Sequence, residues 1–130
     1  MCINSNVNGI ISQISNVKLK AIDNPTNLND IFNKIDYNTI CISAIQSETP
    51  EQIVGFPINT HGYGCLLTIK PIVYETSCMQ IYIPHILDHE NERNRGLYFR
   101  IISDFKKRNS YDPKDLKWRR VEASEFVSTH

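Results

Sequence analysis

The sequence predicts a mainly β fold: a small antiparallel β-sheet knob with one short helix and an N-terminal stem or attachment segment. From Tyr37 onward, most of the chain alternates apolar and polar residues with a period of two, as half-buried strands do. Polar loops separate the alternating runs. The sequence contains neither G-x-x-x-x-G-K nor G-x-G-x-x-G, the phosphate-binding loops that would favour an α/β fold. A length of 130 residues suits a single domain with its own core.

Residues 1–22 differ in pattern from the rest of the chain. They carry apolar residues at a heptad-like spacing, namely Val7, Ile10, Ile14 and Val17. Two interpretations are open: an amphipathic helix or strand packed on the domain, or part of a stem in which several chains bury this stripe together. Two heptads are too few to hold a coiled coil alone. We therefore expect an attachment or oligomerisation segment at 1–22 and a β-rich knob domain at 23–130.

A short helix is predicted directly before the strands. Thr26 or Asn27 can cap its start, because their side-chain oxygens can accept hydrogen bonds from the first free backbone N–H groups. Leu28, Ile31 and Phe32 then share one face. We expect one or two helical turns that lean on the core, with Leu28 and Ile31 as structural anchors.

Five alternating runs are predicted to be strands. They lie at 37–45, 62–73, 77–84, 96–103 and 116–122. A shorter apolar piece at 53–58 contains a glycine and a proline, which suit a sheet edge or a bulge. In the third run we expect Met79, Ile81 and Ile83 to point inward. The strands then form an antiparallel meander with one polar face.

The charge balance argues against nucleic-acid binding. The chain has 14 Lys and Arg residues and 14 Asp and Glu residues, so its formal net charge is zero. Nucleic-acid binders usually carry a basic excess on one face. The cluster of Trp118, Arg119 and Arg120 could still bind a phosphate backbone, or it could be the last strand of the sheet with Trp118 as its anchor.

Membrane insertion and cofactor binding are not expected. No apolar run approaches the roughly 20 residues of a membrane span, and the N-terminus lacks the pattern of a secretory signal. The cysteines are unevenly spaced, without a C-x-x-C pair: Cys2, Cys41, Cys65 and Cys78. Such cysteines are typical of buried free thiols in a protein made in a reducing cytosol.

Only one group of residues suggests metal chemistry. His85 and His89 stand four apart with Asp88 between them, and on a helix both imidazoles would share a face. Pro84 precedes them, however, and strands flank them, so an exposed hairpin loop is the simpler interpretation. With no G-x-S-x-G nucleophile motif either, we expect no metal and no enzymatic activity.

Several tyrosines could form a sugar-stacking platform, although packing against the sheet is their more usual role. They are Tyr63, Tyr74, Tyr82, Tyr98 and Tyr111. Our candidate binding residues are Tyr63 and Tyr98, together with Arg100 and Arg119.

Six pieces of the sequence, taken in order, resemble the knob domain of phage tail fibres and pyocins, the pyocin knob family. They are TNLNDI (26–31), YNTICIS (37–43), HGYGCLLTI (61–69), MQIYI (79–83), LYFRI (97–101) and WRRV (118–121). The likeness extends from residue 26 to about residue 122. The chain departs from the family pattern in having KIDYN before its first strand and a single tryptophan, Trp118, near its end.

The resemblance implies a non-catalytic structural component of a virion, made in the cytoplasm of an infected bacterium. The expected partners are further copies of the chain in a homotrimer, other virion structural proteins, and a host surface glycan or receptor. Trp118 would fill the core beside the closing strand. Arg119 and Arg120 point to opposite faces of a strand and cannot join one phosphate-binding surface. The alternatives are a free-standing carbohydrate- or protein-binding module and, less favoured, a small hydrolase that uses His85, Asp88 and His89.

Overall fold

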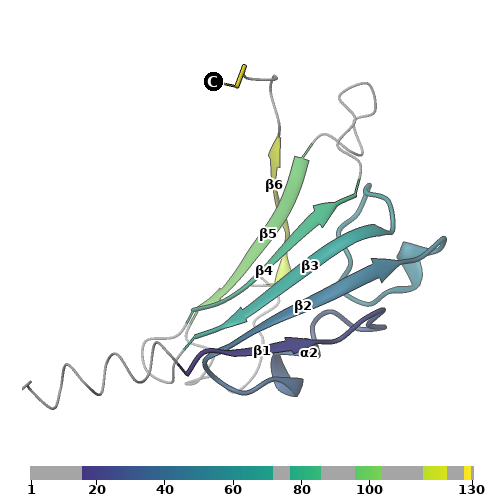
Figure 1. Cartoon of the computed structure of the whole chain (residues 1–130). Helices are drawn as coiled ribbons and strands as arrows, with labels where there is room; N and C mark the ends of the chain where they lie inside the picture. Colours follow the sequence, from purple (N-terminus) through teal and green to yellow (C-terminus); the bar gives the residue numbers. More distant parts are fainter. Residues whose placement is uncertain (1–15, 72–76, 86–95, 104–115, 123–127, 130) are drawn as a thin grey trace, which may run out of the picture.

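The computed structural model describes residues 16–71, 77–85, 96–103, 116–122 and 128–129. It confirms the mainly β prediction: one six-stranded sheet in the order β1-β2-β3-β4-β5-β6 (Figure 1). The strands are β1 (Lys18–Ala21), β2 (Thr39–Gln46), β3 (Tyr63–Lys70), β4 (Ser77–Pro84), β5 (Gly96–Ser103) and β6 (Arg119–Glu122). A short helix, α2 (Ile31–Lys34), and a 3-10 turn, η1 (Pro50–Gln52), lie in the connections.

The sheet is mixed, so the prediction of a purely antiparallel sheet was wrong at one edge. β1 pairs in parallel with β2, whereas each later pair is antiparallel. A parallel pair needs a crossover connection that leaves the sheet and returns. Residues 22–38 provide this crossover and carry α2 with them. The crossover therefore brings the helix over one face of the sheet.

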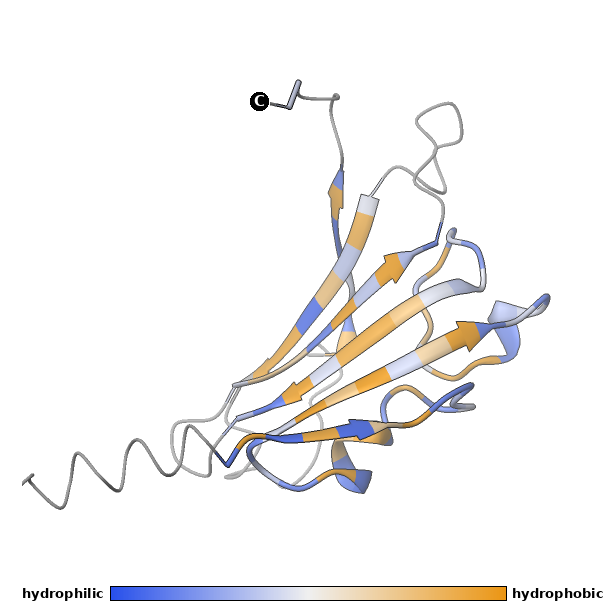
Figure 2. Cartoon of the chain, viewed as in Figure 1, coloured by the Kyte–Doolittle hydropathy of each residue, from blue (hydrophilic) through white to orange (hydrophobic). Residues whose placement is uncertain are grey.

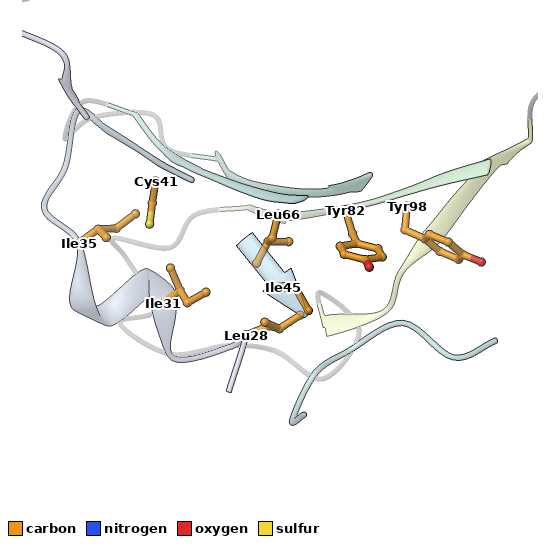
Figure 3. Packing of buried hydrophobic residues seen from close by; sticks show 8 residues of the cluster. All are labelled: Leu28, Ile31, Ile35, Cys41, Ile45, Leu66, Tyr82 and Tyr98. Carbon is orange, nitrogen blue, oxygen red and sulfur yellow. The ribbon is translucent and has the colours of Figure 1, made fainter. Parts of the chain in front are cut away.

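The core lies between that face and the crossover. Its buried cluster contains Leu28, Ile31, Ile35, Cys41, Ile45, Leu66, Tyr82 and Tyr98 (Figure 3). Ile53 and Phe56, from the connection between β2 and β3, pack against the same cluster. We call this side of the sheet the covered face. Leu28 and Ile31, the expected anchors, are both buried there.

Polar contacts hold α2 in place at both ends. The side-chain Oδ1 of Asn27 accepts hydrogen bonds from the backbone N–H groups of Asn29 (3.0 Å) and Asp30 (3.3 Å) just before the helix. At the other end, the Nζ of Lys70 on β3 donates to the carbonyl oxygens of Phe32 (2.8 Å) and Ile35 (3.0 Å). A cation is favourable at a helix C-terminus, where the last carbonyl groups lack partners within the helix. Lys70 therefore ties the helix to the centre of the sheet.

The prediction that Met79, Ile81 and Ile83 point inward was wrong. In β4 the side chains of Cys78, Gln80 and Tyr82 lie on the covered face instead, and all are fully buried. A polar side chain can be buried when its hydrogen bonds are satisfied. Gln80 meets this condition, because its Nε2 donates to the carbonyl oxygen of Leu28 (2.8 Å) and to Oγ1 of Thr68 (3.1 Å).

The predicted N-terminal segment lies mostly outside the described residues. Val7, Ile10 and Ile14 are not among them, whereas Val17 is described and exposed. Residues 18–21 form β1, so the sheet begins inside the segment that the sequence assigned to attachment. The piece at 53–58 forms no strand; Val54 makes an isolated bridge with Asn27.

Candidate functional site

The side of the sheet opposite α2 is apolar and open. The register places these side chains on it: Leu19, Ala21, Ile40, Ile42, Ala44, Cys65, Leu67, Ile69, Met79, Ile81, Ile83, Leu97, Phe99, Ile101 and Val121. We call this surface the open face. None of the elements that the structure describes covers it, and Leu19, Ile42 and Val121 are 77%, 46% and 49% exposed. Hydropathy colouring shows apolar residues in every strand (Figure 2).

Apolar residues face one another from strand to strand without interruption. One row across the sheet is Ala21, Ile42, Leu67, Ile81 and Phe99. The next row is Leu19, Ile40, Ile69, Met79 and Ile101. Directly opposed side chains have Cβ atoms about 5 Å apart and pack against each other. The open face is thus one continuous apolar surface.

The open face carries almost no charge. Arg119, opposite Phe99, is the one charged side chain that the described strands place on it. Lys18 and Lys20 pair with Thr39 and Cys41 and therefore point to the other side. Soluble monomers rarely expose apolar patches of this extent, and such patches mark interaction surfaces. We therefore take the open face as the candidate functional site.

Arg100 organises the polar part of the covered face. Its side chain is 1% exposed. Its Nε (2.9 Å) and Nη2 (2.6 Å) both donate to Oε1 of Gln80. The Nη2 also donates to Oδ1 of Asn29 (2.8 Å), and the Nη1 donates to the carbonyl oxygen of Leu116 (2.9 Å). Such a planar fork of donors suits several acceptors at once. Arg100 thereby joins β4, β5, the start of the helical crossover and the segment before β6.

Trp118 packs beside Arg100, just before β6. The Arg100 guanidinium lies 4.4 Å from the centre of the indole ring, close enough for a cation–π contact. The indole Nε1 donates to the carbonyl oxygen of Gly55 at 2.7 Å. Gly55 has φ +81°, and a Cβ at this position would collide with the side chain of Asn29. Trp118 is thus a half-buried anchor between two loops, rather than a residue of the last strand.

The candidate binding residues from the sequence do not form one site. Tyr98 and Arg100 are buried on the covered face. Arg119 is exposed on the open face. Tyr63 lies at the start of β3, where its hydroxyl donates to the carboxylate of Glu48. This hydrogen bond raises the pKa of the Tyr63 hydroxyl, and burial adds to the effect.

A cleft of about 520 Å³ lies beside Tyr63, in the connection between β2 and β3. Its lining includes Glu48, Ile58, Thr60, His61 and Tyr63. His61 accepts the Tyr63 backbone N–H at Nδ1 (3.2 Å), and its ring stacks on that of Tyr63 with centroids 6.3 Å apart. The Nε2 of His61 and the Oγ1 of Thr60 are buried without a hydrogen-bond partner in the described structure. Both atoms are buried, whereas the Tyr63 side chain beside the cleft is 37% exposed.

The groups considered for metal binding or nucleophilic chemistry are not assembled in the described ranges. His85 is exposed at the end of β4, and Asp88 and His89 lie outside the described residues. No three His, Cys, Asp or Glu side chains among the residues described lie close enough to hold a metal ion. Burial raises the pKa of the Cys78 thiol from its ordinary 9.0 to about 11, which keeps this group protonated at neutral pH.

The open face was missed by the sequence reasoning, although a signal for it was present. In the run 37–45, Ile40, Ile42 and Ala44 form the more apolar side, and such a side is ordinarily assigned to the core. The structure instead buries Cys41 and Ile45 on the covered face and leaves the more apolar side outside. Alternation identified the two sides of the strand but not which of them the crossover covers.

Within the described parts of the chain, no helix is long and apolar enough to cross a membrane. No family model matches this chain, and no curated protein or solved structure matches it.

Proposed function

We propose that this chain is a non-catalytic structural component of a phage virion, a fibre, head-fibre or decoration protein, and that it assembles through its open face. The observation that carries the proposal is the uninterrupted apolar surface across the sheet, with Leu19 77% and Ile42 46% exposed. A surface of this kind is stable in water only when another surface covers it for most of the protein's life.

The part of the proposal that assigns the chain to a virion rests on the six ordered sequence pieces that resemble the pyocin knob family. TNLNDI, which opens them, lies within the crossover and ends at the first residue of α2, and WRRV, which closes them, runs from the anchor Trp118 into β6. In this proposal the chain works as a homotrimer, with other virion proteins as neighbours and a host glycan or receptor as the external ligand. The assembly takes place in the bacterial cytoplasm during infection.

The test is whether the chain is incorporated into particles, and through which surface. Tagged wild-type chain, Ile42→Lys and Ile58→Lys would be produced in cells that release the particles, and gold-labelled antibody to the tag would be applied to purified particles. Ile58 is the matched control, because it is 83% exposed in the β2–β3 connection and away from the open face. We expect label with the wild type and Ile58→Lys, and none with Ile42→Lys. Particles without label in every case would refute the proposal.

A second function, a free-standing carbohydrate-binding module, is favoured by the cleft beside Tyr63. The Tyr63 ring lines this cleft and is 37% exposed, so it provides a surface on which a sugar ring can stack. Saturation-transfer NMR with a panel of oligosaccharides would test this site. We expect a signal for the wild type and for Ile42→Lys, and loss of that signal in Tyr63→Ala. No signal with any sugar of the panel would count against the module.

A further inference from the structure

We infer that another copy of this chain packs on the open face, so that two or more sheets bury their apolar surfaces against each other. The inference rests on the proposed function and names the partner of the same surface.

The open face is large enough for a stable contact between copies. Strands of eight residues, such as β2 to β5, extend about 27 Å, and six strands about 4.8 Å apart span about 24 Å. The surface thus measures roughly 600 Å² in projection, and its side chains add to this area. Each partner in a standard protein interface buries about 800 Å². Covering the open face would therefore produce an interface of ordinary size.

The chemistry of the open face suits a copy of itself better than a different, charged partner. Permanent contacts between identical chains resemble a domain core cut in half, with few charges in the centre. Here the central row is Ile42, Leu67, Ile81 and Phe99, and Arg119, the one charged residue that the described strands place on this face, stands at the end of that row. Two such surfaces complement each other without any pairing of opposite charges, and a contact between identical surfaces needs one apolar patch only.

Exposed apolar residues at the β1 edge of the sheet favour contact between copies at that edge. Val17 is exposed directly before β1, and Leu19, two residues later, is 77% exposed on the open face. An apolar side chain at this edge is suited to contact between copies. The same chemistry continues from Leu19 along its row to Ile101 on β5.

The first test measures the mass of the full-length protein by light scattering, for wild type, Ile42→Lys and Ile58→Lys. A lysine at position 42 places a charge in the centre of the open face, where a second copy would have to desolvate it. We expect the wild type and Ile58→Lys to have the mass of two or more chains and Ile42→Lys to be a folded monomer by circular dichroism. A monomeric wild type, or an unchanged mass in folded Ile42→Lys, would overturn the inference.

A second test needs no variant in the open face. Cys65 lies on the open face between Ala44 and Ile83, whereas Cys41 and Cys78 are buried on the covered face. Alkylation of Cys65 would be followed by mass spectrometry in a Cys2→Ser background while the protein is diluted. We expect the rate at Cys65 to rise at least tenfold as the copies separate, with Cys41 and Cys78 remaining slow. A Cys65 rate that is the same at all concentrations contradicts the inference.

The proposed function and the inference about the open face can be refuted separately. If the free chain is a monomer but virions carry it, another virion protein covers the open face; the inference fails and the proposed function stands. If the chain associates through the open face but is absent from particles, the inference about the surface stands and the proposed function fails.

Discussion

At the scale of single residues, Arg100 is a charged side chain that is buried in the covered face and connects several segments through its hydrogen bonds. It is 1% exposed and donates to Gln80, Asn29 and Leu116. Without Arg100, the buried Oε1 of Gln80 would lose both hydrogen bonds from the guanidinium, and an unsatisfied buried group costs roughly 1–3 kcal/mol. Arg100 therefore has a structural role in the covered face, and it is not the exposed binding residue that the sequence predicted.

We predict that Arg100→Lys lowers the free energy of unfolding by about 2–4 kcal/mol, because a lysine cannot donate to all these acceptors in the same plane. Urea unfolding measures the loss. The matched control is Arg120→Lys on β6, where the side chain is exposed and makes a 3.6 Å ion pair with Glu122. This control should change stability by less than about 0.5 kcal/mol. Equal losses in both variants would show that the Arg100 hydrogen bonds are not important for stability.

Sequence patterns cannot reveal such a buried arginine before the fold is known. The run 96–103 showed Leu97, Phe99 and Ile101 on one side and Tyr98 and Arg100 on the other. That alternation is present in the structure, but a polar residue is normally assigned to solvent. Burial of Arg100 depends on acceptors from Gln80 and Asn29, which stand far away in the sequence and approach only in the folded chain.

At the scale of elements, the two edge strands, β1 and β6, are exposed along their whole length, and β6 closes the sheet. It has four residues, and all of them are exposed. Its backbone pairs with β5, but its anchoring contacts come from the residue before it, Trp118, which packs on the core cluster and donates to Gly55. The closing strand is therefore held mainly by contacts outside its own length.

We predict that Trp118→Ala releases β6 from the sheet and costs about 3 kcal/mol of global stability, because it removes apolar contact area and the hydrogen bond to Gly55. Hydrogen exchange would show faster exchange of the β5 amides that face β6, while those of β3 exchange at nearly the wild-type rate. Trp118→Phe is the comparison, since it keeps an aromatic ring next to Arg100 but loses the indole N–H and part of the ring area. If β3 and β5 exchanged equally fast in Trp118→Ala, the anchor would act on the whole domain.

The strands β2 to β5 follow from local alternation, and the short helix follows from its apolar face, although its N-cap residue Asp30 makes no side-chain capping hydrogen bond. The parallel pairing of β1 with β2 does not, because β1 has four exposed residues and no alternation with buried positions. Its place is fixed by long-range backbone contacts such as Lys18 N–H to the carbonyl oxygen of Asn38 (2.9 Å) and Ile22 N–H to that of Ile42 (3.1 Å). These depend on the crossover rather than on the residues of β1.

At the scale of the whole molecule, the buried titratable groups make the free energy of unfolding depend on pH in the alkaline range. Burial raises the pKa of Cys78 from 9.0 to about 11, and it raises the pKa of Tyr82 as well. A group whose pKa is higher in the folded state stabilises the fold fully below its unfolded pKa and loses this effect as pH rises through the folded value. Lys70 acts in the opposite direction, because burial lowers its pKa below 10.5.

We predict that between about pH 8 and about pH 10.5 the wild type loses about 2 kcal/mol more stability than Cys78→Ala does. The alanine variant keeps the contributions of Tyr82 and Lys70, so the difference between the two slopes isolates the thiol. Urea unfolding at a fixed protein concentration measures it. Parallel stability profiles for the two proteins would show that Cys78 ionises as easily in the folded chain as in the unfolded one.

A row of polar residues on the covered face also determines the register in which the strands pair. Thr68, Gln80 and Arg100 stand opposite one another on β3, β4 and β5. If β5 slipped by two residues, its apolar side chains would still lie on the open face, and that surface would be almost unchanged. Arg100, however, would then lie beside Cys78 or Tyr82 and lose its acceptor on Gln80. Directional hydrogen bonds therefore disfavour misaligned strand pairings during folding. The uniform apolar open face does not distinguish one such register from another.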